Sequence, residues 1–183
     1  AGLYEVVKYG VIADAGLFDR LRRTRDALFA HDPTELEAIV SASASIKANV
    51  VARDERETNL RRTLNFGHTV GHALEAATDY RRFRHGEAVA YGMVAAAELG
   101  ARRGVTPPDA LAAIRDVVAE LGPLPPVTDL KASDVLSATR RDKKVVSGTL
   151  HFVVATRIGA TTELTDVTDK ELRLALKAIG IRR

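Results

Sequence analysis

Three of the five histidines of the chain, His68, His72 and His85, lie within a stretch of eighteen residues. In "NFGHTVGHALE" (65–75), His68 and His72 are four residues apart and Glu75 follows three residues later, so on a helix these side chains share one face. Catalytic zinc takes three ligands from histidine and carboxylate side chains and leaves one position open. The spacing alone leaves three interpretations open: a metal site, half of one, or an ordinary helix surface.

The neighbouring residues favour a site that also binds anions. Gly67 precedes His68 and Gly86 follows His85, and glycine permits tight turns and close backbone approach where helices begin. Helix N-termini attract anions. Five cations that can hold phosphate or carboxylate accompany these residues: Lys8, Lys47, Arg61, Lys143 and Lys144. Each cation alone is typical of a solvated surface. The pattern also differs from the HExxH zinc motif, because Thr69 follows His68.

Composition narrows the class of protein. A chain of 183 residues with 46% hydrophobic and 28% charged residues is typical of one soluble globular domain. The absence of cysteine excludes disulfides, thiolate zinc sites and cysteine nucleophiles. The net charge is only +3 and no basic stretch is interleaved with aromatic rings, so we expect no nucleic-acid partner. No secretory signal pattern opens the chain and residues 88–97 are too few to span a bilayer. We therefore expect a cytoplasmic protein without a membrane partner.

The spacing of apolar residues predicts a mostly helical, bundle-like domain over residues 1–183. Helices are expected over 2–30 with a break near Gly16, over 32–55 starting at Asp32 and Pro33, and over 69–78, 86–104, 106–122, 131–144 and 169–180. Thr106 is the expected cap of the 106–122 helix and Gly122 its end. The 86–104 helix is apolar nearly all round, which predicts a central, buried position. Residues 145–159 predict a small β-hairpin around a Ser147–Gly148 turn.

The chain contains neither a glycine-rich phosphate loop nor a repeated strand–helix unit. We therefore expect no nucleotide-binding half within it.

The segments "RRTLNFGHTVGHALE", "FRHGEAVAYGM", "YEVVKYGVI" and "RRDKK" followed by "GTLHFVV" resemble the C-terminal domain of the 3-dehydroquinate synthase family of sugar-phosphate cyclases. The resemblance covers nearly the whole chain, in the order and at the spacing of the family. It implies that an N-terminal NAD-binding domain, absent from this chain, would complete the active-site cleft. It also implies that the isolated chain is inactive and that the full-length enzyme is a homodimer.

The resemblance implies a role for particular residues. Glu5, His68 and His85 match the ligands of a Zn²⁺ (or Co²⁺) ion, and His72 matches a residue that faces the substrate. His72, Lys8 and Glu57 match catalytic positions; Lys47, Arg61, Asn65 and Lys143 match positions that bind the substrate. Lys144 is the alternative to Lys143 as the anion contact. Tyr4 stands where many members of the family have alanine, so a larger side chain is expected beside Glu5.

The family's reaction is a step of the shikimate pathway. It converts 3-deoxy-D-arabino-heptulosonate 7-phosphate, a phosphorylated sugar acid, into 3-dehydroquinate and phosphate with NAD as a transient oxidant. Three alternatives stay open: a related cyclase that makes an inosose or a valiolone, a metal-dependent polyol dehydrogenase, and a non-catalytic helical binding module.

Overall fold

Helices make up most of the chain, as expected. The computed structural model describes residues 1–54, 60–146 and 150–181, and for 142–146 only the helical backbone. The elements, in chain order, are α1 (Gly2–Ala13), α2 (Ala15–Arg23), α3 (Arg25–Phe29), α4 (Pro33–Arg53), the 3₁₀ helix η1 (Leu60–Asn65), α5 (His68–Ala77), α6 (His85–Arg102), α7 (Pro108–Glu120), α8 (Ala132–Val146), β1 (Phe152–Arg157), β2 (Ala160–Leu164) and α9 (Asp169–Ala178). The predicted fold class, a mostly helical domain with a small hairpin near the C-terminus, is confirmed.

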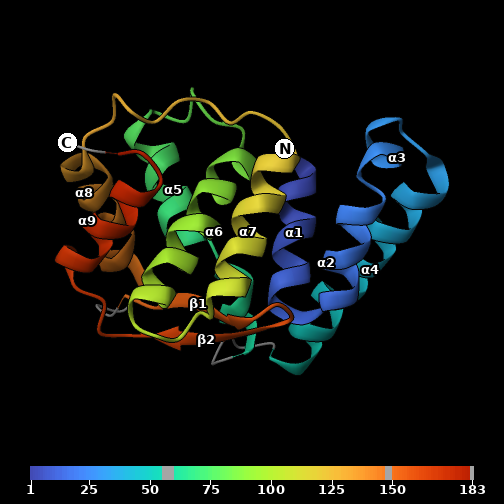
Figure 1. Cartoon of the computed structure of the whole chain (residues 1–183). Coiled ribbons are helices and arrows are strands. Elements are labelled where there is room, and N and C mark those ends of the chain that lie inside the picture. The colour runs from blue at the N-terminus through green and yellow to red at the C-terminus, as the bar shows by residue number, and fades with distance from the viewer. Residues whose placement is uncertain (55–59, 147–149, 182–183) are drawn as a thin grey trace.

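Helix α6 forms the centre of the domain. It packs against α1, α5, α7, α9 and β1, and the hairpin crosses beneath the helices in Figure 1. Its residues from Ala95 to Gly100 are all buried, which confirms the central position predicted from its apolar composition. The many alanines and glycines of α6 let neighbouring backbones approach closely, because little side chain stands between them.

The contact between α5 and α6 is the most extensive of these, and glycine makes it possible. Gly67 precedes α5 with a φ of 79°, a left-handed conformation that glycine adopts without steric cost. A methyl group on Gly92 of α6 would collide with the carbonyl group of Gly67, and one on Gly71 would lie 3.2 Å from the backbone of Val89. This contact holds the start of α5, with His68, against the first turns of α6, which begins at His85.

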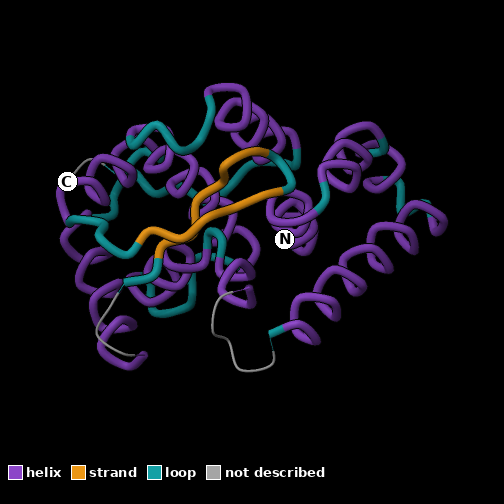
Figure 2. Tube along the Cα trace, turned by 90° about the horizontal axis from the view of Figure 1, so that it is seen from below, coloured by secondary structure: helices purple, strands orange, loops and turns teal. Residues whose placement is uncertain are grey.

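The N-terminal part of the chain breaks close to Gly16, as expected, and once more than expected. The first break is at Asp14, whose side chain accepts a hydrogen bond from the backbone N–H of Leu17 at 3.0 Å and so caps α2. The second break, at Thr24, separates α2 from α3. The start of α4 is as expected: Asp32 accepts from the N–H of Glu35 at 2.9 Å, and Pro33 occupies the first turn. Figure 2 shows α4 at the side of the domain, beyond α1.

Two local predictions near the hairpin were wrong. Its strands pair Phe152 with Leu164 and turn at Ile158 and Gly159, not at Ser147–Gly148. Residues 145 and 146 continue α8 as helix, and Ser147 and Gly148 lie outside the described residues. Thr106 does not cap α7, whose N-cap is Pro107. The Thr106 hydroxyl instead donates to the carbonyl oxygen of Ala155 in β1 at 2.6 Å, because a buried hydroxyl needs an acceptor and β1 passes beside it.

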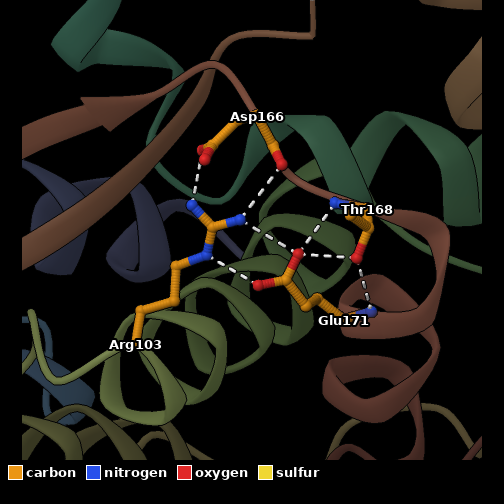
Figure 3. A network of polar contacts seen from close by, with 4 residues as sticks. All are labelled: Arg103, Asp166, Thr168 and Glu171. Carbon is orange, nitrogen blue, oxygen red and sulfur yellow. Dashed lines mark hydrogen bonds and ion pairs between the residues drawn. The ribbon is translucent and has the colours of Figure 1, made fainter.

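A polar network ties the end of α6 to the start of α9 (Figure 3). Arg103 donates from Nε to Glu171 Oε1 at 2.7 Å and from Nη2 to Glu171 Oε2 at 3.0 Å, and it also contacts Asp166. Glu171 forms a capping box with Thr168, whose backbone N–H donates to Glu171 Oε2 at 2.9 Å. The hydrogen bonds from Arg103 lower the pKa of Glu171 to about 2. One carboxylate thus serves both the helix cap and the contact between helices.

Replacing Arg103 with glutamine is expected to lower the free energy of unfolding by about 1–1.5 kcal/mol near neutral pH, because solvent screens these partly exposed charges. The folded-state pKa of Glu171 lies below its ordinary value of 4.5, so this stabilisation is present above pH 4.5 and is lost as the pH falls toward 2. Urea unfolding across this pH range should show the gap between the two proteins closing. The exposed neighbour Arg102 is the control, and Arg102→Gln should change stability by less than about 0.5 kcal/mol.

No helix in the described ranges is both long enough and apolar enough to cross a membrane.

Candidate metal and substrate site

Three side chains from separate elements meet at one point. Glu5 lies on α1, His68 begins α5 and His85 begins α6. Glu5 Oε1 is 3.7 Å from His68 Nε2 and 3.8 Å from His85 Nε2. Ligand atoms of a tetrahedral zinc ion with bonds of about 2.0–2.2 Å lie roughly 3.3–3.6 Å apart, so both distances are slightly longer than those within such a site. The structure therefore brings together the three residues that were predicted to bind the metal.

The hydrogen bonds around these atoms fit a metal ion. Glu5 Oε1 is buried and has no hydrogen-bond partner among the described residues. A buried carboxylate oxygen without a partner is costly, and a cation between it and the two imidazoles would remove that cost. His68 Nδ1 lies 3.1 Å from the carbonyl oxygen of Phe66, and His85 Nδ1 lies 3.1 Å from Glu75 Oε1. Both acceptors require a proton on Nδ1, which leaves the lone pair of each Nε2 free for a metal.

Electrostatics keep Glu5 and His68 in the protonation states that metals bind. Burial lowers the pKa of His68 to about 4, and the Lys8 ammonium group acts in the same direction, so the imidazole is neutral near pH 7. Burial alone would raise the pKa of Glu5, but the Lys8 charge and its hydrogen bond to Glu5 Oε2 at 2.7 Å lower it below the ordinary value. Burial lowers the pKa of Lys8 itself, and its charge interacts with that of Lys47.

His72 lies close enough to this cluster to be a competing ligand. His68, His72 and His85 each offer a nitrogen, and the three nitrogens lie within 4.8 Å of one another. The His72 ring centroid is 5.3 Å from that of His68 and 5.8 Å from that of His85. Distance alone therefore does not distinguish an open three-ligand site from a closed one that includes His72. The assignment of His72 to the substrate stays a prediction.

A surface pocket of about 470 Å³ lies beside His72, and its lining does not include Glu5, His68 or His85. It lies between α5 and α8, and its lining residues are His72, Ala73, Glu75, Ala76, Tyr80, Ala138 and Arg141. The three alanines leave space between the helices, while His72 and Arg141 are exposed at its wall. This combination of space and nitrogen donors beside the metal ligands suits an anionic group of a substrate.

The structure describes only some of the other residues that were predicted to belong to the site. Lys8 is buried beside Glu5, and Lys47 is exposed on α4. Arg61 and Asn65 lie on η1, which contacts α1 and α4; the backbone N–H of Arg61 donates to Asp54 Oδ2 at 3.1 Å. Glu57 lies outside the described residues, as do the side chains of Lys143 and Lys144. The predicted roles of all these residues stay predictions.

Tyr4 does not crowd the ligand Glu5. Its side chain is buried and its hydroxyl donates to the carbonyl oxygen of Gly122 at 3.2 Å, just beyond the end of α7. Consecutive residues of a helix point about 100° apart, so Tyr4 packs toward α7 while Glu5 faces the histidines. Three further residues at the site, Glu75, Tyr80 and Arg141, received no role from the sequence. The i+7 spacing of Glu75 from His68 was the one available signal.

Fold and site together define a helical domain that presents a cluster of side chains able to bind a metal beside a surface pocket. The chain belongs to the 3-dehydroquinate synthase C-terminal family, whose model matches residues 2–145. It is 42% identical to the 3-dehydroquinate synthase of Solibacter usitatus over 92% of this chain and 47% of that protein. It is 40% identical to the 2-epi-valiolone synthase of Actinosynnema mirum over 96% of this chain and 47% of that protein.

Two solved structures have a fold similar to that of this chain. The 2-epi-5-epi-valiolone synthase of Streptomyces hygroscopicus, determined with NAD⁺ and Zn²⁺ bound, matches with a TM-score of 0.86 and 27% identity, over 97% of this chain and 50% of that one. A 2-deoxy-scyllo-inosose synthase complexed with carbaglucose-6-phosphate, NAD⁺ and Co²⁺ matches with a TM-score of 0.76 at 20% identity, over 97% of this chain and 50% of that one, which supports the fold alone. The chain spans about half the length of these relatives.

Proposed function

We propose that this chain is the metal- and substrate-binding half of a 3-dehydroquinate synthase, which forms 3-dehydroquinate and phosphate from 3-deoxy-D-arabino-heptulosonate 7-phosphate. One observation carries the proposal: the buried, unpartnered Glu5 Oε1 faces the Nε2 atoms of His68 and His85. A helical binding module has no need of such an arrangement, whose burial costs free energy. The membership of this chain in the 3-dehydroquinate synthase C-terminal family also supports the proposal.

Glu5, His68 and His85 would hold a divalent ion, zinc or cobalt, in the proposed site. The ion would supply Lewis acidity, lowering the pKa of substrate hydroxyls and polarising a carbonyl oxygen. The 2-epi-5-epi-valiolone synthase structure contains Zn²⁺, which agrees with a divalent metal at this site.

The chain's own residues would bind and orient the rest of the substrate. Lys8 is held by Glu5 beside the metal ligands, where its ammonium group can donate to a substrate oxygen. His72 lies between the ligands and the pocket that contains Arg141, so it can move a proton or donate to an anionic group. Lys47, Arg61, Asn65, Glu57 and Lys143 would complete the contacts. Fixing a doubly anionic substrate in one geometry favours elimination, because less motional freedom remains to be lost.

The NAD-binding half would come from outside the described fold. The described ranges contain one two-stranded antiparallel sheet and no parallel sheet of the kind that binds dinucleotides. The 2-epi-5-epi-valiolone synthase structure contains NAD⁺ and is about twice as long as the matched region. An N-terminal NAD-binding domain, a cleft between the halves and a homodimer of the complete enzyme are parts of the proposal.

A cyclase acting on a sugar phosphate without a carboxylate is the second candidate. The 40% identity to a 2-epi-valiolone synthase is close to the 42% identity to a 3-dehydroquinate synthase, and the valiolone synthase structure has a TM-score of 0.86. The substrate of the first candidate carries a carboxylate, and the substrate of the second does not. The relatives named above do not include a polyol dehydrogenase. An assay for inorganic phosphate distinguishes that alternative, because only a cyclase releases phosphate.

Joining this chain to the N-terminal half of the Solibacter usitatus synthase is expected to give an enzyme that releases phosphate from 3-deoxy-D-arabino-heptulosonate 7-phosphate. The isolated chain should release none, because half of the cleft is missing. His68→Ala in the joined protein should lower the rate by about 100-fold or more, since metal activation supplies several kcal/mol. Phosphate release and 3-dehydroquinate formation are measured together.

The same joined protein should be inactive toward sedoheptulose 7-phosphate and glucose 6-phosphate, which carry no carboxylate and have the carbon numbers of a valiolone and an inosose. Turnover of either compound, with none of the sugar acid, would replace the first candidate by the second. A folded, NAD-binding joined protein that turns over none of the three compounds would contradict both candidates.

A further inference from the structure

Glu75 occupies a position that is costly for a carboxylate. It lies in the last turn of α5, where the negative end of the helix dipole disfavours negative charge. Only 8% of the residue is exposed. In the part of the chain that the structure describes, its ion-pair partner is His85, through Oε1 and Nδ1 at 3.1 Å. Burial of a charge in such a place needs compensation from its surroundings.

His85 is the ligand candidate that most needs external support. Its side chain is 47% exposed, whereas that of His68 is 13% exposed and its ring is fixed by the carbonyl oxygen of Phe66. Each of the two histidines begins its helix, so a preceding helical turn restricts neither ring. The Glu75 carboxylate supplies what the backbone supplies to His68: an acceptor that fixes the Nδ1–H tautomer and the ring orientation.

We infer that Glu75 is a positioning residue, which holds His85 through Nδ1 so that Nε2 points at the ion bound by Glu5 and His68. The inference rests on the proposed metal site and assigns a role to a residue that touches no metal. A divalent ion on the other side of the imidazole would compensate the buried Glu75 charge, and Glu75 would in turn make Nε2 a stronger donor.

The test uses the 183-residue chain and Zn²⁺ alone. Glu75→Leu fills the space without an acceptor and should lower the affinity for Zn²⁺ by about 10–100-fold. Glu75→Gln keeps an acceptor oxygen for Nδ1–H and should recover most of that loss. Glu98 provides the matched control. It is also buried, but it lies farther along α6 and pairs with Arg115 of α7. Glu98→Gln should lower the melting temperature and leave the Zn²⁺ affinity unchanged.

Two further measurements give a signal that a general structural defect would not. The absorption bands of bound Co²⁺ should change in Glu75→Leu and stay close to the original in Glu75→Gln. Nitrogen-15 NMR of the metal-loaded, unsubstituted chain should show the His85 proton on Nδ1 and the metal on Nε2, a result that does not depend on any variant folding.

Three outcomes would overturn the inference: metal on Nδ1 of His85, equal Zn²⁺ affinity in Glu75→Leu and the original chain, or equal losses in the leucine and glutamine variants. If the unsubstituted chain binds no Zn²⁺, the proposed metal site fails first. Failure of the Glu75 assignment with an intact Zn²⁺ site leaves the proposed function standing.

Discussion

His68→Ala is expected to lower the affinity of this chain for Zn²⁺ by at least about 100-fold, whereas His72→Ala should change it by less than about threefold. Loss of a residue that only orients a ligand costs about 10–100-fold, so loss of a ligand costs more. His68 is the more deeply buried of the two, its Nδ1 is bound to a carbonyl oxygen, and its Nε2 faces Glu5. His72 is exposed and lines the pocket toward α8.

The reason for this asymmetry is chemical. An ion held by Glu5, His68 and His85 keeps its next position open for substrate hydroxyls, and a fourth ligand from His72 would close it. Competition with a chromophoric chelator near neutral pH measures both affinities. His31→Asn serves as the control for loss of a histidine: His31 is exposed and has a φ of 60°, a conformation that asparagine tolerates. Equal losses in the His68 and His72 variants would show a closed four-ligand site and refute the assignment of His72 to the substrate.

Gly92→Ala is expected to destabilise the domain by about 3 kcal/mol or more, although alanine is the better helix former by up to about 1 kcal/mol. A methyl group at this position would collide with the carbonyl group of Gly67, which is backbone and cannot rotate away. Crowding therefore outweighs helix propensity. Because Gly67 immediately precedes His68, separation of α5 from α6 should also weaken Zn²⁺ binding.

A graded set of variants tests this explanation by chemical denaturation. Gly71→Ala should cost less than Gly92→Ala, because its nearest contacts are at 3.2 Å. Gly2→Ala should be neutral or slightly stabilising, because the added methyl group would meet no other part of the protein within 4 Å. Equal stability of the Gly92 variant and the original chain would mean that α5 and α6 are not held by this contact.

Most helices could be predicted from the sequence because their signals are local. The period of apolar residues located α4 to α9, and Asp32 with Pro33 marked the start of α4. The errors occurred where contacts with distant parts of the chain determine the local structure. Thr106 looks like a helix cap, but β1 offers its hydroxyl an acceptor from forty-nine residues away. The Val145–Val146 pair looks like a strand, but it continues α8, and the hairpin turns at Gly159, with a φ of 88°.

The site shows the same division between local and distant information. The i, i+4 spacing placed His68 and His72 on one helix face, but spacing could not show that Glu5, on another helix, lies beside His68 and His85. The resemblance to a family supplied that residue, and the structure brings it within 3.7 Å of His68. Glu75 shared the face of His68 by spacing, yet its role depends on the direction in which α6 returns to α5.

The three ligand candidates come from the first helix and from the two central ones, and this has a consequence for the lifetime of the folded chain. A bound ion would be a cross-link between Glu5, near the beginning, and His85, near the middle, closing loops that otherwise cost conformational entropy. At a free metal concentration about 100 times its dissociation constant, such an ion would add roughly 2.7 kcal/mol to the folding free energy. Proteases that cut only the opened state would then meet that state about a hundred times less often. Metal availability would thereby control how long the protein survives in the cell, as well as whether it can act.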